Sequence, residues 1–207
     1  MRRIVSIAVV LLLAAAAQAA PIVLDNGDAG TGQQGDFYYK GGVDAPRTYQ
    51  DDNLWAGPNA SAPSAYYGWQ INTATPGATY DVYATWVIDR QLSPYWQYAN
   101  SAADFTVVNG SIVSQGWPDW NIIPIGSTTS VTVDQSVNAA GFDYDERGWF
   151  KLATITANGP QVSVILTNFS SAEGPVLADA ILINEVPEPA TLALLGLGAF
   201  ALIRRKR

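Results

Sequence analysis

The sequence predicts an all-β fold, a single jelly-roll-like β-sandwich, with an apolar helix at each end of the chain. Three observations support this prediction. Several short segments alternate apolar and polar residues with a period of two, and turns containing Gly, Pro and Asn separate them. No window between residues 21 and 185 shows sustained helical periodicity with caps. Short strands separated by turns in this way are typical of sandwiches and jelly rolls.

The predicted strands differ in how clearly they alternate. Segments 80–88, 149–156 and 161–167 alternate well, and 131–133 is a short fourth candidate. Segment 177–184 is mostly apolar, so we expect a strand covered on both faces. In the first segment the predicted apolar face is Tyr80, Val82, Ala84, Trp86 and Ile88, and the other face is Asp81, Tyr83, Thr85 and Val87.

Turn chemistry and irregular composition mark the connections. Segments 75–77, 109–110 and 158–160 combine Gly with Pro or Asn, which predicts tight turns. Residues 29–65 are rich in Gly, Asp, Asn, Pro and Ser, and residues 89–127 hold several aromatics among turn-formers. We expect both stretches to be long loops or insertions that contain a few short strands.

The first 20 residues predict a secretory signal peptide. Arg2 and Arg3 precede an apolar run from residue 4 to residue 17, and small residues follow. A buried N-terminal helix is the alternative. The positions that form the predicted cleavage site, after Ala19 or Ala20, are Ala17, Ala19 and Ala20.

The C-terminal segment, residues 186–207, predicts a sorting signal with a short transmembrane segment. The apolar run 190–203 would span about 21 Å as a helix, against roughly 30 Å of hydrocarbon. The basic end would lie in the cytoplasm and the exported body outside. The residues that define the signal are Pro187, Glu188 and Pro189 before the run, and Arg204, Arg205, Lys206 and Arg207 after it.

Composition excludes several functions for the body, residues 21–185. Only five of the 11 Lys and Arg residues lie in it, against 17 of the 18 acids, so its net charge is near −12. This charge should repel nucleic acid and anionic lipid. The chain has no His and no Cys, which excludes Ser-His-Asp and Cys-His catalysis and the usual zinc ligands. Two carboxylates could still perform glycosidase chemistry, but the sequence marks no special pair.

Aromatic residues are the candidate ligand-binding groups. The chain has 7 Trp and 10 Tyr, and flat aromatic rings stack on the apolar faces of sugars. The alternative is that these rings plug the ends of the sandwich. Trp86 and Trp149 lie in predicted strands and are expected in the core. The candidates for a binding platform are Trp55, Tyr95, Trp96, Tyr98, Trp117 and Trp120.

Two acidic runs are candidate sites for a structural Ca²⁺, and no other cofactor is expected. Hard cations take six to eight oxygen ligands, and each run concentrates side-chain oxygens. The alternatives are an Asx-type turn for the first run and a solvated loop for the second. The candidate ligands are Asp25, Asn26 and Asp28 in the first run, and Asp143, Asp145 and Glu146 in the second.

The tail resembles the PEP-CTERM sorting signal. The order of Pro187-Glu188-Pro189, an apolar segment and an Arg-rich end carries this resemblance. It implies that the secretion machinery exports the protein and that the inner membrane holds the precursor transiently. An exosortase would then cut near the Pro-Glu-Pro sequence and pass the body to the cell envelope, surface or extracellular matrix.

The body resembles the golvesin C-terminal-like domain, also described as a xanthan-lyase carbohydrate-binding-like domain. The resemblance implies a β-sandwich that accompanies polysaccharide-active enzymes or surface proteins, without catalysis. This chain departs from the pattern in residues 36–65 and 112–127. The matching segments are 23–28, 77–86, 103–107, 133–135, 148–152, 164–168 and 176–181.

Together these features predict an exported, non-catalytic protein that binds or associates with extracellular polysaccharide. A structural or adhesive matrix protein with protein partners is the first alternative, and a polysaccharide hydrolase or lyase is the second. Nucleic acid is not an expected partner.

Overall fold

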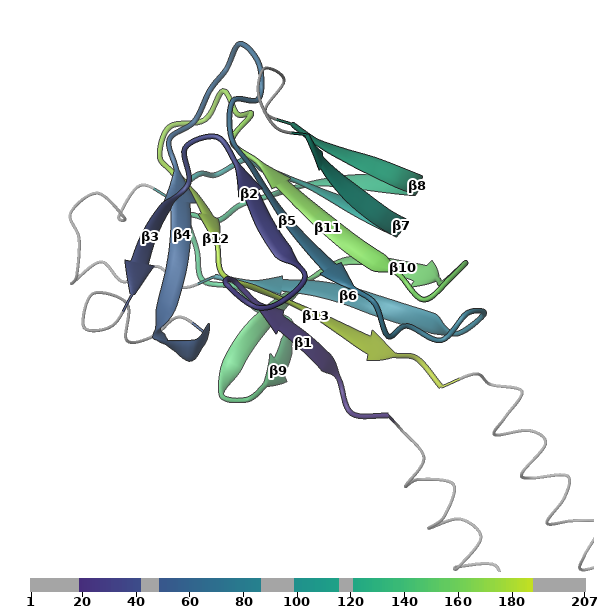
Figure 1. Cartoon of the computed structure of the whole chain (residues 1–207). Helices are drawn as coiled ribbons and strands as arrows, with labels where there is room; N and C mark the ends of the chain where they lie inside the picture. The colour runs from purple at the N-terminus through teal and green to yellow at the C-terminus, as the bar shows by residue number, and fades with distance from the viewer. Residues whose placement is uncertain (1–18, 42–48, 87–98, 116–120, 188–207) are drawn as a thin grey trace, which may run out of the picture.

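The computed structural model describes residues 19–41, 49–86, 99–115 and 121–187 (Figure 1). No α-helix occurs in these ranges, so the all-β prediction is confirmed there; both predicted helices lie outside them. The strands are β1 (Ile22–Asp25), β2 (Thr31–Gln34), β3 (Tyr38–Gly41), β4 (Asp52–Ala56), β5 (Tyr66–Ile71), β6 (Thr79–Thr85), β7 (Ala103–Gln115), β8 (Asn121–Val133), β9 (Phe142–Tyr144), β10 (Arg147–Thr156), β11 (Val162–Thr167), β12 (Val176–Ala178) and β13 (Ala180–Glu185), with a 3₁₀ turn η2 (Tyr49–Asp51).

The strands form a sandwich-like arrangement of curled antiparallel sheets. The first sheet has the order β1-β13-β6-β10-β9, and the second has the order β2-β5-β11-β7-β8. A smaller sheet, β12-β4-β3, lies at one end of the sandwich (Figure 1). The finer jelly-roll assignment stays a prediction.

The main core lies between the two large sheets and follows the predicted alternation. On β6, Tyr80, Val82 and Ala84 are buried in this core, and Trp86 joins them directly after the strand. The last two residues of the predicted segment, Val87 and Ile88, lie outside the described residues. The second sheet contributes the inward residues of β5, β7 and β11. The predicted alternation of residues 161–167 is likewise confirmed, because Val162, Val164 and Leu166 face the core while Ile165 packs on the outer face of its sheet.

A bulge in β10 changes which residues share a face. Leu152 has no partner in the ladder with β6, and the register shifts between Lys151 and Ala153. The extra residue lets both Leu152 and Ala153 pack on the core. As a result, Lys151 and Thr154, three residues apart, both reach the outer face of the first sheet.

The long hairpin β7–β8 corrects two predictions. Residues 109–110 are not a tight turn, because Asn109 and Gly110 continue β7, and residues 112–115 and 121–127 are strand rather than loop. Gly110 lies opposite Gly126, and both have positive φ angles, +152° and +143°. A Cβ on Gly110 would lie 2.1 Å from the carbonyl oxygen of Ile125, so glycine permits this close approach of the two strands.

The predicted strand over residues 177–184 is two strands in different sheets. Asp179 separates β12 from β13, and its buried carboxylate accepts hydrogen bonds from the backbone N–H of Tyr49 at 3.1 and 3.2 Å. The break thus places a buried carboxylate against a backbone donor of η2. The prediction that the segment is covered on both faces is confirmed, because residues 176–183 are all buried.

Both ends of the described chain leave the sandwich at the same place. β1 and β13 are antiparallel neighbours, with Ile22 opposite Ile183. The start of β1 therefore lies beside the end of β13, as Figure 1 shows at its lower right. The smaller sheet lies at the other end of the molecule.

Candidate functional site

The smaller sheet carries an exposed aromatic pair, Tyr38 and Trp55. The two residues are direct neighbours across β3 and β4, and their ring centroids lie 5.0 Å apart at an interplanar angle of 34°. Trp55 packs against the main core, whereas Tyr38 is 51% exposed. The pair thus offers an open aromatic surface, held in place by a half-buried ring, which is suited to stacking on an apolar ligand face.

The indole of Trp55 contributes apolar packing to the aromatic pair and no hydrogen bond. Its Nε1 is buried and finds no acceptor among the described residues. An unpaired buried N–H costs about 1–3 kcal/mol, so this tryptophan is held by apolar contact and not by a hydrogen bond. Among the described aromatic residues, Tyr38 is the one whose ring contacts the Trp55 indole while about half of its own surface is exposed to solvent.

The other predicted platform residues lie outside the described residues. Tyr95, Trp96 and Tyr98 belong to residues 87–98, and Trp117 and Trp120 belong to residues 116–120, which join β7 to β8. Their role stays a prediction. The predicted core residues are confirmed, since Trp86 is 1% exposed and Trp149 is fully buried.

A second candidate surface is a shallow hollow on the outer face of the second sheet. The distal part of the β7–β8 hairpin folds back over β5, where Ile112 and Ile122 would each touch a Cβ placed on Gly68. The backbone N–H of Ile112 donates to Oε1 of Gln70 at 2.9 Å. The hollow has a volume of about 160 Å³, and its lining is uncharged: Gly30, Thr31, Gly32, Gln70, Ile112, Ser114 and Ile122.

Sequence reasoning missed both the hollow and the partner of Trp55. Strand periodicity says which face a residue occupies, but not which distant strand lies beside it or folds over it. Tyr38 lies within residues 29–65, for which the composition predicts long loops or insertions with a few short strands. The odd glycine in an otherwise bulky strand, Gly68, was the available signal that another chain segment approaches closely.

The first acidic run forms a turn at the end of β1. Oδ1 of Asp25 accepts the N–H of Asn26 at 2.8 Å, and Oδ2 of Asp28 accepts the N–H of Asp25 at 3.0 Å. Asp25 and Asn26 are buried, and Asp28 is exposed. The carboxylates thus serve backbone donors, as in the turn alternative, and binding of Ca²⁺ here stays a prediction.

The second acidic run is the hairpin turn between β9 and β10. Asp145 and Glu146 have φ angles of 51° and 60°, and Tyr144 pairs with Arg147 on either side of them. Two left-handed residues between paired strands fit a two-residue hairpin turn. Asp143 precedes this turn and is exposed. Within the described residues, no group of three or more acidic side chains is arranged to hold a metal ion.

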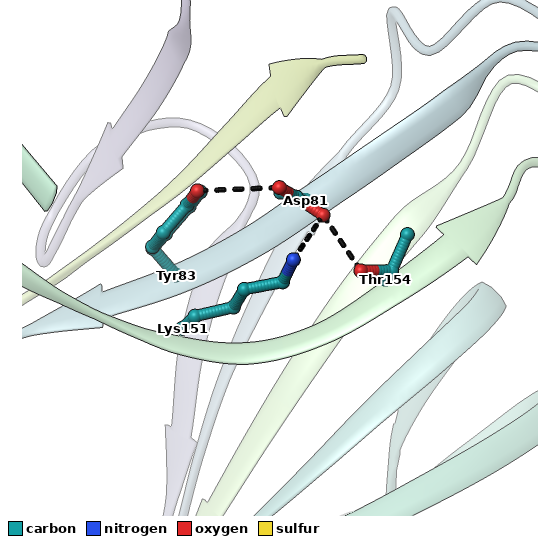
Figure 2. A network of polar contacts seen from close by, with 4 residues as sticks. All are labelled: Asp81, Tyr83, Lys151 and Thr154. Carbon is teal, nitrogen blue, oxygen red and sulfur yellow. Dashed lines mark hydrogen bonds and ion pairs between the residues drawn. The ribbon is translucent and has the colours of Figure 1, made fainter. Parts of the chain in front are cut away.

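The outer face of the first sheet carries a polar network centred on Asp81 (Figure 2). Oδ1 of Asp81 pairs with Nζ of Lys151 at 2.7 Å and accepts a hydrogen bond from Thr154 Oγ1 at 2.6 Å. Oδ2 accepts a weaker bond from the Tyr83 hydroxyl at 3.3 Å. The β10 bulge makes this network possible, because it brings Lys151 and Thr154 to the same face.

The network shifts two pKa values in opposite directions. Burial alone would raise the pKa of the Asp81 carboxyl, but the hydrogen bonds from Lys151 and Thr154 and the lysine charge lower it overall. Burial, together with the Asp81 charge, raises the pKa of the Tyr83 hydroxyl. Asp81 is therefore held ionised in an ion pair, which is the state of a structural carboxylate rather than of a general acid.

These features define a sandwich-like all-β domain followed directly by a sorting motif. Residues 185–207 match the family model for the PEP-CTERM protein-sorting motif, which confirms the prediction for the tail. Such a motif indicates export and exosortase-dependent processing of a membrane-anchored precursor. No helix within the described ranges has the length and hydropathy of a membrane span, and the predicted span 190–203 lies outside them.

Solved structures resemble the body to different degrees. Xanthan lyase from Paenibacillus matches with a TM-score of 0.54 and 21% identity, over 81% of this chain and 13% of that chain. A family 35 carbohydrate-binding module from Clostridium thermocellum matches with a TM-score of 0.42 and 13% identity, over 80% of this chain and 98% of that chain. A GH26-CBM35 β-(1,4)-mannanase from Podospora anserina matches with a TM-score of 0.36 and 17% identity, over 82% and 28%.

Only the first of these likenesses is close enough to support a conclusion, and that conclusion concerns the fold. The predicted likeness of the body to a domain of xanthan lyase is confirmed at this level. The chain spans about an eighth of the lyase, whose activity therefore does not transfer with the fold. No curated protein matches the chain.

Proposed function

We propose that this protein is an exported, non-catalytic β-sandwich protein that an exosortase sorts to the cell envelope, surface or extracellular matrix, where it associates with polysaccharide. The observation that carries the proposal is the sorting motif at residues 185–207, which begins at the last residue of β13. The chain then passes from domain to motif without an intervening spacer.

The described surface supports a binding role better than a catalytic one. Tyr38 on Trp55 offers an aromatic ring to a sugar face, and the hollow at Gln70 and Ser114 offers neutral hydrogen-bonding groups to hydroxyls. The chain has no His or Cys to act as a base or nucleophile, and the Asp81 carboxylate is neutralised by Lys151. An uncharged binding surface on an acidic body favours neutral polysaccharide.

The sorting half of the proposal is tested on the C-terminus of the protein. In a host that contains an exosortase, mass spectrometry of cell-bound and released protein should find a mature C-terminus near Pro187. Replacing Pro187, Glu188 and Pro189 with Ala should leave the tail in place. A wild-type protein that keeps Arg207 in every fraction would contradict this half of the proposal.

The binding half is tested by affinity electrophoresis against a panel of neutral and acidic polysaccharides. Tyr38→Ala should abolish retention, because it removes the exposed ring but no core contact. The matched control is Ile125→Ala, which removes another exposed apolar side chain, 54% exposed, from β8 of the second sheet. Equal retention of Tyr38→Ala and the wild type would exclude the aromatic pair as the binding surface.

A further inference from the structure

The end of the sandwich from which the tail departs is a surface of unusual composition. Three connections meet there: the β5–β6 turn (72–78), the β10–β11 turn (157–161) and the bend of the β7–β8 hairpin (109–110 with 125–127). Hydrogen bonds join them, since Gly77 N–H donates to Ala157 O and Asn109 Nδ2 donates to Thr156 O, at 2.8 and 2.7 Å. We call these residues the neutral rim.

No residue of the neutral rim is charged, although the body is strongly acidic. Most of its side chains are exposed, and Ile125, 54% exposed, is its large apolar residue. Among the described side chains, the nearest acids are Glu185, which is half-buried, and Asp81, which is paired with Lys151. The other acids with described side chains lie towards the opposite end: Asp25, Asp28, Asp36, Asp104, Asp134, Asp143, Asp145, Glu146, Glu173 and Asp179.

The start of the tail lies next to the neutral rim and is hydrogen-bonded to the sandwich there. The N–H of Val186 donates to the carbonyl of Thr79 at 2.8 Å, so the chain is held to the sandwich up to the residue before the Pro-Glu-Pro sequence. From Val186 to Ala190, where the apolar run begins, the chain can span at most about 14 Å. The headgroup layer on one side of a bilayer is about 5–8 Å thick.

The short tether to the apolar run and the absence of charge on the neutral rim together indicate that the rim lies against lipid. If the apolar run lies in the bilayer, as anchoring of the precursor requires, the remaining tether is too short to hold the domain far from the headgroups. An acidic end at this position would be repelled by anionic lipid, whereas an uncharged end is not. The start of β1 lies opposite Ile183, near the end of β13, so a leader still attached to the body would leave from the same end.

We infer that the neutral rim is a membrane-facing surface, on which the folded body rests against the lipid headgroups of the bilayer until the tail is cut. This inference rests on the sorting half of the proposed function and not on polysaccharide binding. The aromatic pair and most of the acids then point away from the membrane, and the sorting enzyme meets its cleavage site directly beneath a folded domain.

The test uses the full-length precursor in a host without exosortase, purified and reconstituted into vesicles. The natural chain has no Cys, so each single-Cys variant reports one position. A fluorophore at Asn158→Cys should be strongly quenched by a nitroxide on the lipid headgroup, and one at Glu146→Cys, at the opposite end, should not. Equal quenching at the two positions would overturn the inference.

A third probe, at Leu197→Cys in the tail and read with a nitroxide on the lipid acyl chain, separates the inference from the proposed function on which it rests, because Leu197 lies in the middle of the apolar run. If the tail probe is quenched and the rim probe at Asn158→Cys is not, the precursor is anchored but its body is held away from the bilayer. This result would overturn the inference alone. An unquenched tail would show that the precursor is not anchored, and would overturn both.

A charge substitution tests the role of neutrality. The double variant Thr75→Glu with Asn158→Glu should lose quenching of a Ser127→Cys probe on anionic vesicles at low salt, and should regain it at high salt. The neutral pair Thr75→Gln with Asn158→Gln is the matched control and should behave like the wild type. Circular dichroism checks that all variants are folded. Unchanged quenching in the acidic variant would contradict the charge argument and overturn the inference.

Discussion

The outer faces of the two large sheets are stabilised by different physical means. The first sheet carries the Asp81 ion-pair network beside an apolar cluster around the buried Trp149. On the second sheet, the described residues that line the hollow are uncharged, and the β7–β8 hairpin covers part of the sheet by placing Ile112 and Ile122 over Gly68. One face therefore depends partly on charge and the other on close packing, so pH, salt and side-chain volume should affect them differently.

The aromatic cluster of the first sheet should give the largest effect. Trp149 is fully buried, its ring lies edge-on to Tyr49 with centroids 5.8 Å apart, and its Nε1 donates to the carbonyl of Tyr144 at 3.0 Å. Trp149→Ala should lower the free energy of unfolding by about 3–5 kcal/mol, measured by denaturant titration. Ile122→Ala on the second sheet should cost less, because the hairpin that it holds can settle into the space. A larger loss from Ile122→Ala would reverse the comparison.

The bend of the hairpin should give the next largest effect. Gly110→Ala places a Cβ 2.1 Å from a carbonyl oxygen at a φ of +152°, so the strands must separate or the backbone must shift. We expect a loss of about 1–3 kcal/mol in the same titration. Gly159→Ala is the matched control, since its Cβ would meet nothing closer than 3.9 Å. Equal stability of the two variants would show that the bend is not strained by a side chain.

These sites mark the limit of what the sequence could predict. The predictions at 80–88 and 161–167 correspond to β6 and β11, because alternation is a local property that a buried face imposes on its own residues. Asn109-Gly110 has the composition of a hairpin turn, and the prediction was wrong because strand pairing continues beyond it. The β10 bulge is not visible in the sequence, because only the pairing with β6 shows which residue is extra.

The candidate site also has a part that the sequence could predict and a part that only the fold shows. Trp55 was selected from its composition and surroundings, but its partner Tyr38 follows from the register of β3 on β4. The hollow depends on a hairpin that folds over a strand about 40 residues away in sequence, as the bond from Ile112 to Gln70 shows. Contacts of this length are set by the whole fold and not by a local pattern.

The Asp81 network should make the first face sensitive to pH. The folded-state pKa of Asp81 is lowered, so the stabilisation is present above its unfolded pKa and is lost as pH falls through the folded value. At pH 7, Asp81→Asn should cost about 1 kcal/mol, a modest loss because Lys151 is 48% exposed. Unfolding measured from pH 7 down to pH 2 should show the wild type and variant converging. A constant difference across this range would mean that the charge of Asp81 does not matter.

The hydrogen bond between Gln34 and Ser114 should give the smallest loss of stability. This loss should also differ from that of Asp81→Asn in its dependence on salt and pH. Nε2 of Gln34 donates to Oγ of Ser114 at an exposed position, where water can replace either partner. Ser114→Ala should therefore cost only about 0.5 kcal/mol. Because both groups are neutral, the cost should be the same at low and high salt and at pH 3 and pH 7, whereas the cost of Asp81→Asn should shrink with added salt. If the two variants responded alike to salt, charge would not distinguish the two faces, and the difference between them would be one of packing alone.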